Sequence, residues 1–390
     1  MTSKNWPYYS SEEIQKVVKV LKSGKVNYWS GNYCKIFERL YAKKFNLNYC
    51  ITVANGTVAL EAALKSLNLK TNDEVLVPSK SYQSSASAIV TSGAKPIFCD
   101  IDFNSQNLQI SDLIKKITNK TKAIICVHLG GWPCEMDRLI KIAKKKKLVL
   151  IEDCSQAHGA KINKKFVGSF GDIAIWSFCN DKIISTGGEG AMIAVKKKEI
   201  WKKIWAYKDI GKNYDKVKKN LKNKSSGFNW VHDTFGTNLR MTEMQAVLGI
   251  HQLNKLNKTI SRRNYLNNLI WASLKNHKAV IIPKVPKNIN LSPYRCYIKL
   301  NLEMIKKKYD LKKIVKLLNS KNQICNEGSC SEMYLESSFQ MLNLSPKKRL
   351  KNASKLSAVS LAFYINPFIS NEEMNKKIKK IIKVFDQILA

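Results

Sequence analysis

Long apolar runs, paired cysteines and acidic side chains are all scarce in this sequence. No run of about 18 or more apolar residues occurs, so we expect no membrane span and no membrane insertion. The first residues show no cationic stretch followed by an apolar one, and we expect no secretory signal. The ten cysteines lie singly, without the close pairs typical of zinc ligands. We therefore expect a cytoplasmic protein with reduced thiols and no metal site.

The shortage of acidic residues leaves a strongly basic chain, with 67 Lys and Arg against 29 Asp and Glu and a formal net charge of +38. Such a surface could attract nucleic acid or another polyanion. The lysines are spread over the whole chain, however, and Arg, whose bidentate fork reads base edges, is much rarer than Lys. We expect no nucleic-acid partner and a milder role in steering an anionic small molecule. A non-catalytic basic binding protein is the alternative outside the enzymes.

Short apolar segments alternate with helical patterns over the first two thirds of the chain. Strands are predicted at 50–54, 74–78, 95–102, 122–131, 148–153, 172–178 and 190–195, with the last returning alongside its neighbour. This alternation is typical of a mostly parallel sheet covered on both faces. Beyond about residue 240, long helical patterns and an alternating segment at 295–302 predict an α+β unit. We expect a large α/β domain over 1–240 and a smaller C-terminal α+β domain over 241–390.

Candidate functional residues follow three of these strands, and in open α/β sheets ligands bind outside the carboxyl ends of the strands. The sequence "NGT" at 55–57 stands where a strand turns into a helix. A glycine there lets backbone N–H groups approach an anion, although the same triplet also forms ordinary tight turns. Asp153 could cap a helix, or it could pair with a ring nitrogen of a cofactor that Gln156 also contacts.

Lys182 follows the third of these strands and precedes the glycine-rich stretch "STGGEG". Ser177 could bind the same anion as Thr57. A phosphate cradle, a carboxylate for a pyridine nitrogen and a lysine at neighbouring strand ends describe a pyridoxal phosphate (PLP) site. We expect burial and neighbouring positive charge to lower the pKa of Lys182 so that it acts as a base. His158 is expected to be a packed core residue.

The motifs at these strand ends make the chain resemble the sugar aminotransferases of the DegT/DnrJ/EryC1/StrS family over nearly its whole length. The run E-D-x-x-Q-A-H-G-A at 152–160, followed by G-S-F-G-D and S-F-x-x-x-K, is specific in combination. The resemblance implies a fold-type I PLP-dependent transferase with Lys182 as the Schiff-base lysine. It also implies that Asp153 pairs with the pyridine nitrogen and that Gln156 contacts the 3-hydroxyl of the ring.

The same resemblance implies the remaining cofactor contacts. Gly56, Thr57 and Ser177 would hold the phosphate, and Tyr82 would stack on the ring. Asn238, in "GTNLRMTE", would complete the phosphate site of the neighbouring subunit. The implied assembly is a homodimer with two composite active sites.

The implied reaction moves an amino group from an amino acid, L-glutamate in the family, to a nucleotide-linked keto-deoxy sugar in surface-polysaccharide or amino-sugar biosynthesis. Relatives that dehydrate sugars carry a histidine at the position of Lys182, so the lysine favours transamination over a PLP-dependent sugar dehydratase or lyase. Three departures from the family pattern occur. "NGT" replaces S-G-T, Ala191 replaces a glycine, and "CNDK" replaces the frequent P-T-K, which sets Asp181 beside the lysine.

Overall fold

The computed structural model describes residues 5–222, 229–321, 325–328 and 330–390. Its large sheet has the strand order β1-β9-β8-β5-β4-β2-β3. The strands are β1 (Tyr49–Val53), β2 (Glu74–Pro78), β3 (Lys95–Cys99), β4 (Thr121–Val127), β5 (Val149–Asp153), β8 (Ile173–Ser177) and β9 (Ala191–Val195). β9 pairs antiparallel with both β1 and β8, whereas the other neighbouring pairs are parallel. The predicted fold class, a mostly parallel mixed sheet in an α/β domain, is confirmed.

Two of the predicted strands end earlier than the sequence indicated. β3 stops at Cys99 rather than at residue 102, and β4 stops at Val127 rather than at residue 131. A 3₁₀ turn, η1 (Leu129–Gly131), follows β4, and Gly130 and Gly131 have φ of 65° and 86°. A Cβ on Gly131 would clash with the carbonyl of Ser292, so the chain passes too close to the later segment for an extended strand to continue.

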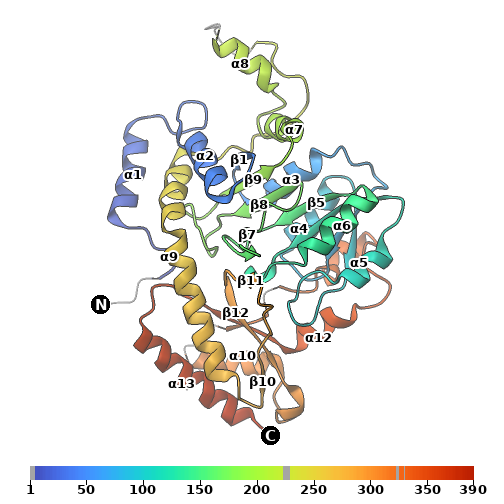
Figure 1. Cartoon of the computed structure of the whole chain (residues 1–390), viewed down its shortest axis with the longest axis vertical. Coiled ribbons are helices and arrows are strands. Elements are labelled where there is room, and N and C mark those ends of the chain that lie inside the picture. The colour runs from blue at the N-terminus through green and yellow to red at the C-terminus, as the bar shows by residue number, and fades with distance from the viewer. Residues whose placement is uncertain (1–4, 223–228, 322–324, 329) are drawn as a thin grey trace.

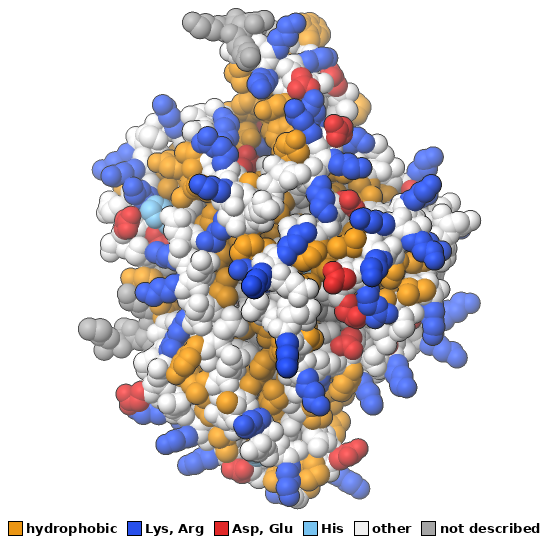
Figure 2. Space-filling model, in the orientation of Figure 1, with side chains coloured by type: hydrophobic (Ala, Val, Ile, Leu, Met, Phe, Trp, Pro, Cys, Tyr) orange, Lys and Arg blue, Asp and Glu red, His pale blue; other side chains and the backbone are white. Residues whose placement is uncertain are grey.

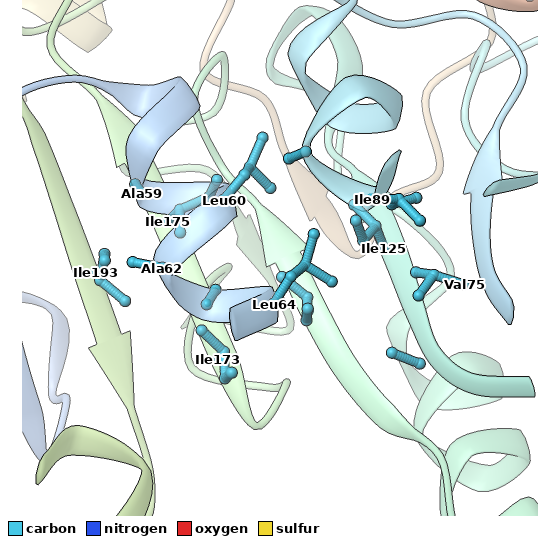
Figure 3. Close-up of a cluster of buried hydrophobic side chains, with 14 of the residues drawn as sticks. Ala59, Leu60, Ala62, Leu64, Val75, Ile89, Ile125, Ile173, Ile175 and Ile193 are labelled. Atoms are coloured by element: carbon cyan, nitrogen blue, oxygen red, sulfur yellow. The ribbon is translucent and has the colours of Figure 1, made fainter. Parts of the chain in front are cut away.

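Helices cover both faces of the large sheet because alternate strand residues point to opposite sides. On one face lie α3 (Gly56–Lys65), α4 (Ser84–Thr91) and α7 (Lys198–Lys208). Figure 3 shows Leu64 of α3 and Ile89 of α4 on the side of the sheet where Ile125 lies. On the other face lie α2 (Tyr33–Phe45), α5 (Ile110–Lys116), α6 (Met136–Lys146) and the first half of α9 (Glu243–Leu274). The alternating pattern is clear in β8, where Ala174 and Trp176 face this second layer.

A smaller antiparallel sheet, in the order β10-β12-β14-β13, forms the centre of the C-terminal α+β domain (Figure 1). Its strands are β10 (Val280–Ile281), β12 (Arg295–Leu300), β13 (Cys325–Glu327) and β14 (Ser360–Tyr364), and it packs on α10 (Leu311–Ser320), α13 (Asn371–Ile388) and the end of α9. Because α9 contributes Leu253 to the large-domain core and Ile270 to the small one, it joins the two. The division at 240/241 stays a prediction.

The remaining elements are short or peripheral. They are α1 (Ser11–Lys22), β6 (Lys161–Ile162), β7 (Lys165–Phe166), α8 (Tyr214–Lys222), β11 (Ile289–Asn290), η2 (Leu302–Met304), η3 (Met333–Leu335), α11 (Ser337–Met341) and α12 (Lys351–Val359). Within the described residues, no helix combines the length and apolarity needed to cross a bilayer. Lys and Arg side chains are scattered over the face shown in Figure 2 rather than gathered in one patch.

Candidate active site

A cavity of about 710 Å³ lies at the carboxyl ends of the parallel strands. Its described lining comes from the segments after β1, β2, β5 and β8 and from β12, β13 and β14 of the smaller domain. Seven of the eight site residues predicted from the sequence line this one cavity: Gly56, Thr57, Tyr82, Asp153, Gln156, Ser177 and Lys182. The volume is in the range of cavities that hold a cofactor together with a substrate.

The N-terminus of α3 opens onto the cavity. Asn55 caps the helix, since its side chain accepts a hydrogen bond from the Val58 N–H at 3.1 Å. This arrangement leaves Gly56 and Thr57 at the first helical positions, where backbone N–H groups and the helix dipole favour an anion. A Cβ on Gly56 would come within 2.9 Å of the Ser177 Cβ. The glycine therefore allows the helix terminus and the end of β8 to form one narrow cradle.

Asp153 ends β5 and is 5% exposed. One carboxylate oxygen accepts the Ser155 N–H at 3.0 Å, and the other accepts the Ser85 hydroxyl at 3.3 Å. Two hydrogen bonds hold the carboxylate in a fixed orientation at the wall of the cavity. Gln156 is 6% exposed, and its Oε1 accepts the Gly130 N–H at 2.7 Å. The turn after β4 thus orients the amide side chain.

Lys182 projects into the same cavity from the loop between β8 and β9. Its Nζ lies 3.0 Å from Asp181 Oδ1 and 3.5 Å from the Tyr294 hydroxyl, and it sits 4.7 Å from the centroid of the Tyr294 ring. Burial by itself lowers the pKa of the amine, but Tyr294 and Asp181 together outweigh burial and raise the Lys182 pKa above its ordinary value. The expected lowering of this pKa was wrong, because the nearest charge is an anion.

The loop that carries Lys182 is held by the N-terminal segment. The indole N–H of Trp6 donates to the Lys182 carbonyl at 2.8 Å. The Tyr9 hydroxyl donates to Ser185 Oγ at 2.9 Å and accepts the Gly187 N–H at 2.9 Å. These contacts join residues more than 170 positions apart in the chain and fix the backbone on either side of the turn after Lys182.

Tyr82 and Asn238 differ from the other predicted residues. Tyr82 lines the cavity, but its side chain is 68% exposed, so it stands at the opening. Asn238 is exposed and does not belong to the described lining of this cavity. Its backbone forms a β-bridge with Asp209, and its Oδ1 accepts the Arg240 N–H at 3.3 Å. The structure of the single chain therefore does not bring Asn238 to the other seven residues.

Several lining residues were not singled out by the sequence. Arg295 begins β12 and Tyr294 directly precedes it. Both contact Asp181: the Tyr294 hydroxyl donates to its Oδ2, and Arg295 Nη2 lies 3.4 Å from the same oxygen. Asn326, Gly328, Cys330 and Glu189 also line the cavity. The segment "SPYRCYIKL" was a signal for Tyr294 and Arg295, since it alternates like a strand and opens with two side chains able to bind anions.

A separate polar cluster lies within the large domain. His128 Nε2 lies 3.1 Å from Glu152 Oε2, and with Cys154 these buried residues place three potential metal-ligand atoms within 4.8 Å of one another. His128 Nδ1 accepts the Cys134 N–H at 3.0 Å, so Nε2 carries the proton that is donated to Glu152. Neither ring nitrogen therefore offers a lone pair to a metal, and the cluster is explained as a hydrogen-bonded core network.

His158 is fully buried against Phe178, as the sequence predicted for a packed core residue. Burial, with a smaller contribution from the nearby Lys182, lowers the pKa of His158 to about 3. The imidazole is therefore neutral throughout the physiological range.

The cavity fits PLP on features of its own. A helix N-terminus and two hydroxyl side chains suit a phosphate, the Gly56 cradle leaves room for it, and a buried carboxylate and a lysine amine face one space.

Comparisons with known proteins agree with this geometry. The profile described as the DegT/DnrJ/EryC1/StrS aminotransferase family matches residues 7–382. The GDP-perosamine synthase of Escherichia coli O157:H7 is 39% identical over 257 residues, which are 66% of this chain and 67% of that protein. The dTDP-3-amino-3,6-dideoxy-alpha-D-galactopyranose transaminase of Aneurinibacillus thermoaerophilus is 36% identical over 69% of each chain.

Solved structures give the same result for the fold. The X-ray structure of the aminotransferase from Psychrobacter cryohalolentis matches with a TM-score of 0.95 at 37% identity, covering 99% of both chains. The fold-type I architecture expected from the sequence is thus confirmed, and PLP is the cofactor of the family. The chain belongs to the DegT/DnrJ/EryC1/StrS aminotransferase family and is a PLP-dependent sugar aminotransferase.

Proposed function

We propose that the protein transfers an amino group from L-glutamate to a nucleotide-linked keto-deoxy sugar, as a step in surface-polysaccharide or amino-sugar biosynthesis. The observation that carries the proposal is the convergence of Lys182, Asp153 and the α3 N-terminus on one cavity. The similarity to a GDP-sugar synthase and to a dTDP-sugar transaminase supports a nucleotide-linked acceptor. We further infer that the enzyme works in the cytoplasm, which suits the absence of disulfides among its described cysteines.

Different lining residues would hold the phosphate and the ring of the cofactor. The phosphate would be bound by the N–H groups of Gly56 and Thr57 and by the hydroxyls of Thr57 and Ser177. Asp153 would keep a proton on the pyridine nitrogen through a charged hydrogen bond, and Tyr82 would cover the ring from the cavity opening. When bound, PLP supplies an electron sink that stabilises negative charge at the amino-acid Cα.

Lys182 is the residue that moves protons. In the first half-reaction its Nζ would take the proton from the Cα of glutamate. The amino nitrogen would stay with the bound cofactor, and water would supply the keto oxygen of the departing 2-oxoglutarate. In the second half-reaction the same amine would return a proton to the sugar carbon that receives the amino group, while the keto oxygen of the sugar leaves as water. The Trp6 and Tyr9 contacts hold the backbone of this loop, so the four-carbon side chain can swing while its base stays fixed.

We also propose a homodimer in which Asn238 reaches the phosphate site of the partner subunit. Asn238 follows a segment with two almost fully exposed aromatic side chains, Trp230 at 93% and Phe235 at 101%. Exposed aromatic residues of this size are typical of protein interfaces. A second copy of the chain would bury them and bring Asn238 to the composite site. Size-exclusion chromatography with light scattering should give twice the chain mass, and a monomer at working concentrations would contradict this assembly.

The experiment on the activity combines spectroscopy with mass spectrometry. Purified protein incubated with PLP should show the absorption band of the lysine-bound cofactor, and glutamate should shift it. Lys182→Ala should abolish the band. Lys80→Met is the matched control, because Lys80 is buried beside the lining residue Ser81 but does not line the cavity. A band that survives in Lys182→Ala and disappears in Lys80→Met would contradict the assignment.

The acceptor is identified by incubating glutamate with a panel of keto-sugar nucleotides. Amination of one sugar with equimolar 2-oxoglutarate supports the proposal. Conversion of the sugar without 2-oxoglutarate would instead indicate a dehydratase or lyase, the alternative within the PLP enzymes.

A further inference from the structure

Asp181 occupies an unusual place, directly beside the proposed cofactor-binding lysine. Its Oδ1 lies 3.0 Å from Lys182 Nζ, and its Oδ2 accepts the Tyr294 hydroxyl and lies 3.4 Å from Arg295 Nη2. The Asp181 carboxylate thus contacts an ammonium, a phenol and a guanidinium group at the same time. The sequence comparison with the family had marked this aspartate as a departure from the frequent P-T-K.

The ion pair is partly shielded from water. The side chains of Lys182 and Arg295 are 16% and 15% exposed, and that of Asp181 is 36% exposed. At this degree of burial a pair at 3.0 Å is stronger than a surface salt bridge. The two cations also both lie against Tyr294, with Nζ of Lys182 4.7 Å and Cζ of Arg295 4.9 Å from the ring centroid. Tyr294 therefore keeps both cations close to the same carboxylate.

Other charged groups surround this set without replacing Asp181. Arg263 on α9 is fully buried and adds a further cation to this region. Tyr364 on β14 adds a phenol, and its ring centroid lies 4.7 Å from Arg295 Cζ. The described titratable groups that act on Lys182 or Asp181 are Cys179, Tyr294, Arg295, Arg263, Tyr364 and the neutral His158. Among the residues that the structure describes, Asp181 is the carboxylate within ion-pair distance of the lysine.

We propose that Asp181 is a positioning residue that receives the Lys182 amine whenever the lysine is not joined to the cofactor, while Tyr294 orients the carboxylate and Arg295 limits how tightly the amine is held. The inference rests on the proposed function, because it assigns Lys182 two positions, one on the cofactor and one on Asp181. When the lysine moves away, Asp181 keeps Tyr294 and Arg295 as partners, so its partly buried charge is not left unpaired. When the lysine returns as an ammonium, it finds a carboxylate already oriented by Tyr294.

The experiment measures the titration of Lys182 rather than turnover. Protein stripped of cofactor is mixed with PLP over a pH series, and the capture rate is followed by absorbance. Capture joins the neutral ε-amine to the aldehyde with loss of one water, so the midpoint of the rate profile reports the amine pKa. In parallel, Lys182 is labelled with an amine-selective reagent and quantified by peptide mass spectrometry, which gives the same midpoint without cofactor.

Asp181→Asn and Asp181→Thr should each lower the midpoint by about one to three pH units, the usual effect of removing an opposite charge at this distance. Arg295→Gln should raise the midpoint, because Asp181 loses its competing cation and Lys182 loses a like charge. Glu189→Gln is the matched control, another cavity carboxylate that contacts Cys179 rather than the lysine, and it should leave the midpoint in place. Opposite shifts in the Asp181 and Arg295 variants are not expected from a general loss of packing.

An unchanged midpoint in both Asp181 variants, or a lowered one in Arg295→Gln, would overturn the inference. Failure of the wild-type protein to capture PLP at any pH would instead contradict the proposed function. The labelling measurement remains decisive in that case, because it needs no cofactor.

Discussion

Replacing Gly56 by alanine gives the sharpest test of the phosphate cradle. The added Cβ would stand 2.9 Å from the Ser177 Cβ and 3.2 Å from its Oγ, whereas carbon atoms in contact normally lie about 3.5–4.0 Å apart. The helix terminus and the end of β8 must therefore separate by roughly 0.6 Å or more. Overpacking of this kind costs about 1–3 kcal/mol. Because each 1.4 kcal/mol is tenfold, we expect PLP to bind about five- to 140-fold more weakly.

The sign of the effect makes this prediction informative. Gly56 does not have a positive φ, and alanine in a helix is otherwise more favourable than glycine by up to about 1 kcal/mol. Without the close contact, Gly56→Ala would stabilise the protein. Thermal unfolding of the cofactor-free protein and a PLP titration measure the two consequences. In a Ser177→Gly background the contact is gone, so the extra effect of Gly56→Ala should disappear. An alanine variant that is more stable and binds PLP normally would refute the reasoning.

Three further outcomes are expected. Trp6→Phe removes the 2.8 Å hydrogen bond to the Lys182 carbonyl and should cost about 0.5–1.5 kcal/mol in unfolding free energy, measured by denaturant titration; no loss would mean that the N-terminal segment does not hold the loop. The buried neutral His158 should make stability fall on acidification from pH 6.5 toward about 3, by about 1.4 kcal/mol per pH unit, because the unfolded chain binds the proton and the folded chain does not. A His158→Gln variant that keeps the same acid slope would contradict this. Mixing Lys182→Ala and Asn238→Ala proteins under subunit exchange should restore activity at about a quarter of the sites, since a mixed dimer has one complete site; no recovery would contradict a composite site.

Much of the large domain could be predicted because its strands are buried on both faces. The segments that form β2, β5 and β8 are almost continuously apolar, so their ends can be recognised in the sequence. β2 begins and ends at the residues that the sequence predicted. The predicted strand at 122–131 was too long for a reason outside its own sequence. Gly130 and Gly131 turn away because the segment around Ser292 passes against them, and that contact spans about 160 residues.

The residues of the candidate site also fall into those that the sequence could predict and those that depend on distant contacts. Residues at strand ends, such as Asp153 and Ser177, could be assigned because the carboxyl edge of a parallel sheet gathers them without knowledge of distant contacts. Tyr294 and Arg295 reach the cavity only because the smaller domain folds back over that edge. The direction of the Lys182 pKa shift was predicted wrongly for a similar reason. The sequence showed that Asp181 is next to the lysine, but it did not show that the Asp181 carboxylate faces the amine.

The high positive charge of the chain has to be reconciled with this cavity, because a basic binding protein was the alternative outside the enzymes. Its described lining carries three carboxylates, Asp153, Asp181 and Glu189, against the cations Lys182 and Arg295. A polyanion entering such a site would meet carboxylates at short range, where a unit charge repels most strongly. On the face shown in Figure 2 the lysines are scattered and form no continuous track for a phosphate backbone. Their charge acts instead at long range, where it raises the local concentration of a small anionic substrate. At short range the α3 N-terminus, through dipoles rather than full charges, is the feature suited to hold a phosphate.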